Sequence, residues 1–159
     1  MSRETPDIAR GILQDLHDDH NEVAALIDEI MDTEDHSERE ELFAEMTAKL
    51  LAHARAAQEV FYRRLEASIS EESQWFAHQG ANEHQMVEHQ LQKMSVATDK
   101  MTDRWTAELK VLEDLVSRHV DEEEDVGFSC AREDFDEDQL EAMGRQFQQR
   151  KQQLLMRVA

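Results

Sequence analysis

The sequence predicts an all-α protein: an up-down-up-down antiparallel four-helix bundle followed by a fifth, C-terminal helix. Only four of the 159 residues are Gly and only one is Pro, which is too few for a β-rich fold with many tight turns. Apolar residues recur at steps of three and four, as they do on the core-facing side of a helix. The predicted helices are similar in length and their connections are short, so neighbours are expected to run antiparallel. We assign residues 1–159 to one domain, with a four-helix core at about 7–124.

The first helix is predicted over residues 7–33, and the second from about residue 37 to about residue 67. Ser37 and Glu40 form the pattern of a capping box, in which each side chain bonds the backbone N–H of the other residue. Each of these helices has six residues on its core-facing side. They are Leu13, Leu16, His20, Val23, Ile27 and Ile30 in the first, and Phe43, Met46, Leu50, His53, Ala57 and Val60 in the second.

The third helix is predicted to open at the capping signature of residues 68–71 and to reach about residue 98. The fourth is expected from about 103 to 124. The acidic stretch from Asp125 to Asp136 contains Gly and is expected to be irregular. The last amphipathic helix is predicted at about 137–158.

Each of the four long helices carries one histidine on its core-facing side, namely His20, His53, His84 and His119. All four lie roughly 15 to 17 residues, or about 22–26 Å, from the end of the bundle that holds the first and third turns. Glu123 follows His119 by four residues and therefore points the same way. Burying unpaired polar groups costs several kcal/mol, so four imidazoles and a carboxylate at one level of a core are hard to explain as packing. Both groups are common metal ligands, and the pattern therefore favours a metal site.

Four motifs carry a resemblance to a known family: Asp19-His20, the segment from His53 to Tyr62, Glu83-His84, and His119-Val-Asp-Glu-Glu123. In this order and spacing they resemble the hemerythrin-like (HHE cation-binding) family, over about residues 10–130. The resemblance implies a single hemerythrin-like domain with a non-haem di-iron centre. It implies ligands from one His of the first helix, a His-x-x-x-Glu pair of the second, one or two His of the third, and a His-x-x-x-Glu pair of the fourth. Activities in that family include oxygen binding, sensing of iron, oxygen or nitric oxide, and repair of damaged iron centres.

The chain departs from the family pattern at Ala57, where the second-helix motif requires a Glu. In the family that Glu bridges the two irons, so its loss removes both a ligand and a negative charge. Three outcomes stay open. A single metal ion could lie among the four histidines and Glu123, a two-metal site could be completed by Glu88 or His17, or the site could be degenerate and empty.

Other polar residues near the predicted site have weaker signals. Tyr62 lies nine residues past His53, two to three turns away, and we expect no direct role for it. Asp19 and Glu83 each precede a candidate ligand, and two interpretations stay open for them: hydrogen-bond acceptors for the histidines, or surface residues. Cys130 is the only cysteine, which excludes an internal disulfide framework.

The formal net charge of −20 argues against nucleic acid as a partner, because phosphate binding needs basic patches. No apolar run is long enough for a membrane span or a secretion signal, so no membrane association is expected and the predicted location is cytoplasmic. The expected partners are a metal ion with dioxygen or nitric oxide, and a homodimer is the assembly considered.

Three functions compete. The first is a non-enzymatic bundle that holds one or two iron ions and binds or senses dioxygen, nitric oxide or metal. The second is an enzyme that performs iron-dependent oxidation or repairs iron centres. The third is a metal-free bundle that acts through its acidic surface. Imidazole and carboxylate suit several metals; the resemblance implies iron, and zinc is the alternative.

Overall fold

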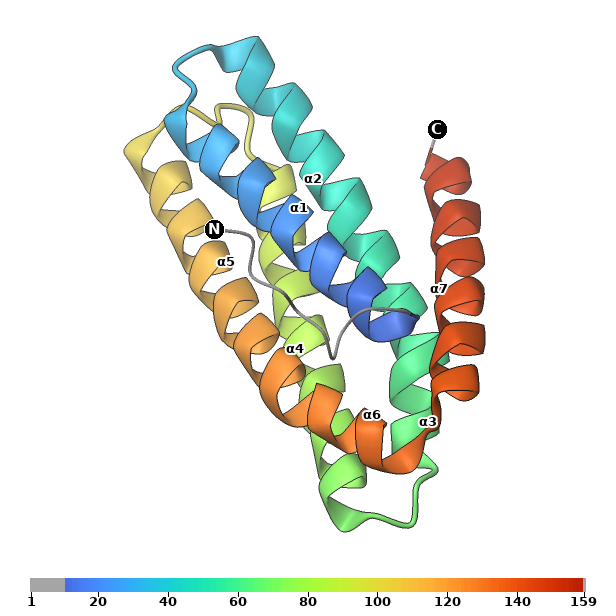
Figure 1. Cartoon of the computed structure of the whole chain (residues 1–159). Helices are drawn as coiled ribbons and strands as arrows, with labels where there is room; N and C mark the ends of the chain where they lie inside the picture. Colours follow the sequence, from blue (N-terminus) through green and yellow to red (C-terminus); the bar gives the residue numbers. More distant parts are fainter. Residues whose placement is uncertain (1–10, 159) are drawn as a thin grey trace, which may run out of the picture.

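The computed structural model describes residues 11–158, and these residues form helices without any strand. Four long antiparallel helical stretches make the bundle, and a fifth helix lies beside it (Figure 1). This confirms the predicted fold class. The elements are α1 (Ile12–Asp32), α2 (His36–Ala57), η1 (Gln58–Tyr62), α3 (Arg63–Glu66), α4 (Glu71–Ser95), α5 (Asp103–Glu122), η2 (Glu123–Gly127), α6 (Phe128–Asp134) and α7 (Glu137–Val158), where η marks a π-helical segment.

The observed helix starts agree only in part with those predicted from the sequence. The side chain of Asp35 caps α2 by accepting from the backbone N–H of Glu38 at 2.9 Å, so the predicted capping box of Ser37 and Glu40 is wrong. Asp35 is the N-cap because it directly precedes the first helical residue, and because its negative carboxylate interacts favourably with the positive end of the helix dipole. α4 starts within the predicted segment 68–71, but its N-cap is Ser70, whose side chain accepts from the backbone N–H of Ser73. The expected start of the first helix at residue 7 lies outside the described residues.

The acidic stretch predicted to be irregular is mostly helical. α2 continues through η1 into α3, and α5 likewise continues through η2 into α6, with the chain becoming extended only at Phe135. Phe128, Cys130 and Ala131 are buried, so tertiary packing outweighs the weak helix signal of the local composition. Gly127 allows the close approach of the Phe76 ring, which any Cβ at this position would overlap.

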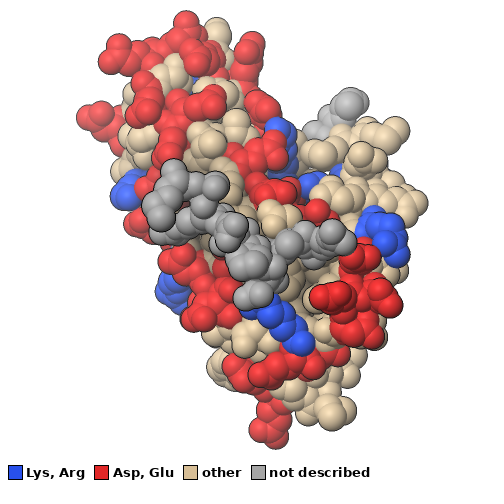
Figure 2. All heavy atoms as spheres, viewed as in Figure 1, with Lys and Arg blue, Asp and Glu red and all other residues tan. Residues whose placement is uncertain are grey.

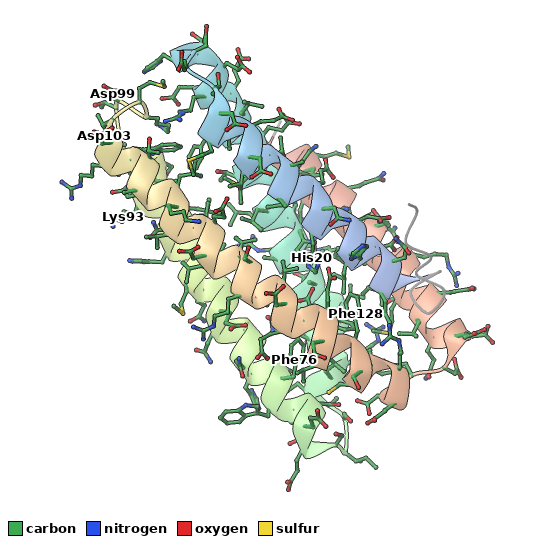
Figure 3. The ribbon with its side chains drawn as sticks, turned by 60° about the vertical axis from the view of Figure 1, so that its left-hand side comes forward. His20, Phe76, Lys93, Asp99, Asp103 and Phe128 are labelled. Atoms are coloured by element: carbon green, nitrogen blue, oxygen red, sulfur yellow. The ribbon has the colours of Figure 1, made fainter. Side chains whose placement is uncertain are left out.

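The apolar core is divided into two clusters. One lies towards the α1–α2 and α4–α5 turns and includes Ile27, Met46 and Trp105. The other lies towards the α3–α4 turn and includes Phe61 and Phe128. Figure 3 shows His20 midway along the bundle, between the end marked by Asp99 and Asp103 and the region of Phe76 and Phe128. The predicted histidine layer therefore separates two apolar clusters.

Helix α7 packs against α1 and α2 and contributes Met143 and Phe147 to the second cluster. Two ion pairs anchor it. Lys151 contacts Asp19 of α1, and Arg150 contacts Glu59 of η1 at 2.6 Å. α7 thereby covers the outer side of the α1–α2 pair (Figure 1).

Acidic side chains cover much of the face drawn in Figure 2, with few basic ones among them. None of the helices in the described part of the chain is long and apolar enough to cross a membrane.

The outer and inner sides of α5 give a matched test of the core. Leu112 is fully buried, whereas its neighbour Val111 is 49% exposed. Leu112→Ala is expected to lower the free energy of unfolding by about 2–5 kcal/mol because it leaves a cavity, and Val111→Ala by less than about 0.5 kcal/mol. Urea unfolding followed by circular dichroism, with a chelator present, measures both. Equal losses would contradict this placement of α5.

Candidate functional site

The four predicted histidines meet in two pairs inside the bundle. The ring centroids of His20 and His53 lie 5.1 Å apart, and those of His84 and His119 lie 4.6 Å apart. Three of the rings are buried and His84 is half-buried. The predicted convergence at one depth is therefore present.

Glu123 lies between the two pairs and is fully buried. Its Oε1 is 2.9 Å from Nε2 of His20, and its Oε2 is 3.3 Å from Nε2 of His119. One carboxylate thus faces both pairs, one oxygen to each. Glu123 is the first residue of η2, directly after the helical turn that carries His119.

Three further carboxylates hold the outer nitrogens of three histidines. Asp19 Oδ2 lies 2.8 Å from Nδ1 of His53, and Glu83 Oε1 lies 2.8 Å from Nδ1 of His119. Asp19 and Glu83 therefore bond histidines on neighbouring helices, and neither bonds the histidine that follows it in sequence.

The third carboxylate is Glu124, whose Oε2 lies 2.6 Å from Nδ1 of His20. When Nδ1 donates to a carboxylate, the imidazole keeps its Nε2 directed at the opposite side, which is the usual arrangement around a ligand histidine. His84 lacks such a partner: its Nδ1 has no hydrogen bond to any described residue. Its ring instead stacks on Tyr62 at 4.9 Å between centroids.

Helix α7 supports one of these pairs from outside. Nζ of Lys151 lies 2.7 and 2.9 Å from the two oxygens of Asp19. The ring of Phe147 packs edge-on against His53, with centroids 5.6 Å apart. Lys151, Asp19 and His53 therefore form a connected series from the surface of α7 to the centre of the bundle.

Burial and the carboxylates act in opposite directions on the imidazole pKa values. Burial lowers the pKa of His20, but the bonds to Glu123 and Glu124 outweigh it and raise that pKa to about 9. The pKa of His119 is also raised to about 9, because Glu123 and Glu83 outweigh burial in the same way. Burial together with the charge of His119 lowers the pKa of His84 to about 3.

Glu123 is held as a carboxylate. Burial opposes its charge, but the hydrogen bonds of His119 and His20 outweigh burial and keep the pKa of Glu123 well below its ordinary value. Burial lowers the pKa of His53 despite the bond to Asp19. In the ion-free protein, two protonated imidazoles therefore neutralise a buried anion, beside two neutral imidazoles.

Tyr62 also belongs to this cluster, and the prediction that it lies too far away is wrong. Its hydroxyl donates to Oε2 of Glu123 and lies 3.1 Å from Nε2 of His119. The reason is η1, in which the N–H of Arg63 donates to the carbonyl of Gln58, five residues earlier. This wider turn contains one extra residue. Tyr62 is therefore rotated about the helix axis by about 100° less than in a regular α-helix, which brings it nearer the side of the helix that carries His53.

The direction of the side chain completes the approach. A helical side chain leans towards the helix N-terminus, so the long ring of Tyr62 reaches back to the histidine layer. Gly80 leaves the space it needs, since a Cβ there would overlap the ring. A π-helical insertion has no clear signature in a single sequence, and this is why the sequence missed Tyr62.

The two weaker candidates do not enter the cluster. Glu88 is exposed on α4. His17 is half-buried, and its Nδ1 lies 3.0 Å from Glu124 Oε1, so it supports Glu124 from outside. Ala57 is buried and offers no ligand atom, and Glu59, two residues further on, is paired with Arg150 of α7.

The cluster can hold cations. His20, His53 and Glu123 offer one set of ligand atoms within 4.8 Å of one another, and His84, His119 and Glu123 offer a second such set. Nε2 of His53 is buried without a hydrogen-bond partner in the described structure, and Nε2 of His20 and Oε1 of Glu123, which face each other at 2.9 Å, bond nothing else there. Buried polar atoms without partners are rare, and these three converge on one point, as the ligands of an ion would.

The chain matches the hemerythrin HHE cation-binding domain family over residues 11–131. A DNA nickase from Nostoc sp. (strain PCC 7120) is 27% identical over 140 residues, which are 88% of this chain and 39% of that protein. The chain thus spans about two fifths of that relative. A hemerythrin HHE cation-binding domain-containing protein from Mycobacterium kansasii, described as an Rv2633c homolog, has a crystal structure with a TM-score of 0.80. It is 22% identical, and the match covers 92% of this chain and 88% of that one.

The only tyrosine of the chain gives a direct test of the cluster. Burial and then the charge of Glu123 raise the pKa of Tyr62 well above its ordinary value. In the folded, ion-free protein the tyrosinate absorbance should therefore stay flat between about pH 8 and 11, whereas the unfolded chain ionises near pH 10. Because only the unfolded state loses this proton, stability should fall as the pH rises above about 10. Gly80→Ala, which displaces the ring, should restore a lower pKa. A reversible midpoint near 10 in the folded wild type would contradict the placement.

Proposed function

We propose that this chain, which belongs to the hemerythrin HHE cation-binding family, holds two iron ions in its histidine–glutamate cluster and uses them to bind a small gas, dioxygen or nitric oxide. The observation that carries the proposal is Glu123, whose two oxygens each face a different pair of imidazoles. One ion would be held by His20, His53 and Glu123, and the other by His84, His119 and Glu123. Iron accepts imidazole and carboxylate ligands together, and ferrous iron with an open position binds dioxygen or nitric oxide.

The number of carboxylates around the cluster supports the binding of two ions, although Ala57 stands where the family pattern has a Glu. Asp19, Glu83 and Glu124 each lie one imidazole away from the cluster centre. Their negative charges, with that of Glu123, offset two divalent cations, although Lys151 reduces the share of Asp19. Tyr62 adds a phenol oxygen on the His119 side. We infer that these groups together replace the lost Glu.

An enzyme is the second candidate, and Tyr62 favours it. Its hydroxyl donates to Glu123 in the centre of the cluster, so Tyr62 would supply a proton for oxidation chemistry at the iron. Reversible gas binding would favour the first function, and consumption of the gas with turnover would favour the second. We do not extend DNA cleavage to this chain, because the nickase match covers a minor part of that relative and the net charge of −20 opposes phosphate binding.

Metal content tests the proposal. Protein reconstituted anaerobically with ferrous iron is expected to retain about two ions per chain, with a metal–metal distance near 3.5–4 Å by X-ray absorption. Glu123→Gln should reduce retention to less than about one ion, because ligand replacement weakens binding strongly. Glu88→Gln is the matched control on the exposed side of α4 and should bind as the wild type does. Wild-type protein with less than about 0.1 ion per chain, or equal loss in both variants, would contradict the proposal, and a preference for zinc would replace iron.

Ion binding should also release protons. His20 and His119, with pKa values of about 9, carry protons at neutral pH that a cation must displace. At about pH 7.5 we expect the release of about two protons per chain, falling towards zero above about pH 10 as both imidazoles lose their protons beforehand. An indicator dye in weak buffer measures the release, and Tyr62→Phe shows whether the phenol adds another proton. Release that does not change across this pH range would contradict the assigned protonation states.

A further inference from the structure

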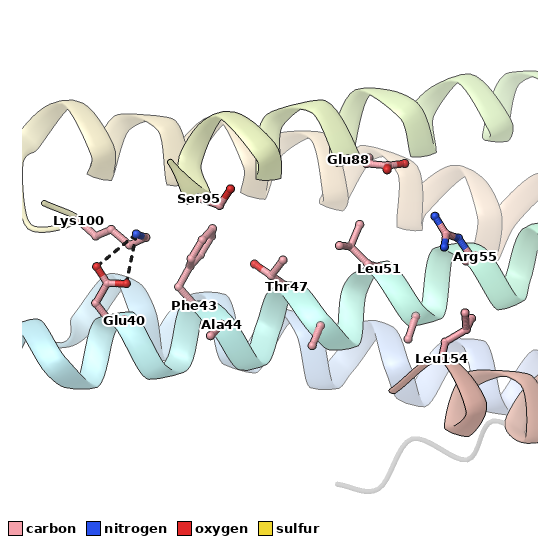
Figure 4. A pocket seen from close by; sticks show the side chains of 12 residues that line it. Glu40, Phe43, Ala44, Thr47, Leu51, Arg55, Glu88, Ser95, Lys100 and Leu154 are labelled. Carbon is pink, nitrogen blue, oxygen red and sulfur yellow. Dashed lines mark hydrogen bonds and ion pairs between the residues drawn. The ribbon is translucent and has the colours of Figure 1, made fainter. Parts of the chain in front are cut away.

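A groove on the α2–α4 face of the bundle reaches one of the site histidines. Its first section runs along α2 from Lys100 to Arg55, with Glu88 opposite on α4 (Figure 4). A second section, of about 390 Å³, shares Leu51, Arg55 and Glu88 with the first and is also lined by His84. The two sections therefore adjoin along the α2–α4 face, and the second one ends beside His84 of the histidine cluster.

A small cavity lies among the four histidines themselves. Its volume is about 20 Å³, which is room for about one molecule of the size of water. Apart from the imidazoles and Asp19, its lining is aliphatic and includes Val23 and Val116. A space of this size and polarity fits a diatomic ligand and excludes an organic substrate.

The groove and the cavity are separated by a thin wall. Four residues line both, namely Leu50, Ala54, His84 and Val87. Ala54 has the smallest side chain among them, and it is half-buried. His84 is the one of the four site histidines that is half-buried, and it also lines the groove. One layer of side chains, thinnest at Ala54, therefore divides the cavity from the surface.

The other three faces of the bundle are closed by charged pairs at the same level. Asp19 with His53 links α1 to α2 and is covered by α7. Glu124 with His20 links α5 and η2 to α1. On the third of these faces, Glu83 of α4 bonds His119 of α5.

The α2–α4 face differs from these three. Among residues 11–158 no carboxylate bonds His84 there, and its Nδ1 is without a partner. We propose that this groove is the access route by which a small neutral gas reaches the ions, and that the side chain at position 54 controls its passage. The proposal rests on the proposed function.

A pair of alanines on α2 provides the test. Ala54→Leu thickens the wall, whereas Ala48→Leu adds the same bulk to the part of the groove away from it. With nitric oxide and the ferrous protein, Ala54→Leu should slow association and dissociation together by about tenfold or more, because a gate raises the barrier in both directions. Since Ala54 also lines the cavity, a loss of affinity without slower rates would mean that the new side chain fills the cavity, and would count against the gate. Ala48→Leu should change either rate by less than about twofold. Metal content measured in each variant should equal that of the wild type.

A second measurement uses the ion-free protein and dissolved dioxygen as a paramagnetic probe. The methyl groups of Val23 and Val116, which line the cavity but not the groove, should relax faster in the presence of dioxygen. Ala54→Leu should remove that enhancement and Ala48→Leu should keep it. If the chain retains no iron, the proposed function fails but this measurement still tests the route. Equal effects of the two variants, or none from Ala54→Leu in both measurements, would overturn the proposal.

Discussion

The buried carboxylate of Glu123 is the constraint on which the rest of the site depends. A charge taken fully out of water is costly unless cations or hydrogen-bond donors surround it. In the ion-free protein the protonated imidazoles of His20 and His119 and the hydroxyl of Tyr62 meet this requirement. A cation bound to these imidazoles would replace their protons and face the same carboxylate, so one geometry suits both the protonated and the ion-bound state.

The carboxylates behind the histidines connect the site to the fold. Asp19, Glu83 and Glu124 come from three different helical stretches, and each bonds a histidine of a neighbouring one. They therefore hold helices together at the level of the site while they orient the imidazoles. Helix α7 lies outside the matched family region of residues 11–131, yet Lys151 extends this network to it. Three faces are closed by these pairs, and the open fourth face is the one that ends at His84.

The acidic surface and the buried carboxylates of the cluster both favour the binding of cations. A strongly negative field raises the local concentration of cations and disfavours anionic polymers. The two apolar clusters on either side of the histidines keep the site dry, so each remaining charge interacts strongly there. Ala57 adds no charge to the cluster; the nearest negative charges are those of the carboxylates bonded to the imidazoles, and the phenol of Tyr62 lies beside them.

By itself, the sequence determined the helices and the depth of the histidines. The spacing of apolar residues placed His20, His53, His84 and His119 on core-facing sides, and the rise per residue set their common level. The i to i+4 relation placed Glu123 beside His119. These are local properties of a helix, which is why counting along the chain was enough.

Tertiary structure alone decided which groups complete the cluster. The π-helical turn that brings in Tyr62 and the exposure of Glu88 both depend on how helices pack, and no local pattern records them. Asp19 and Glu83 were recognised as acceptors, but their partners across helices were not. A helix fixes the direction of its own side chains, whereas the partner of each side chain is fixed by the distance and rotation between helices.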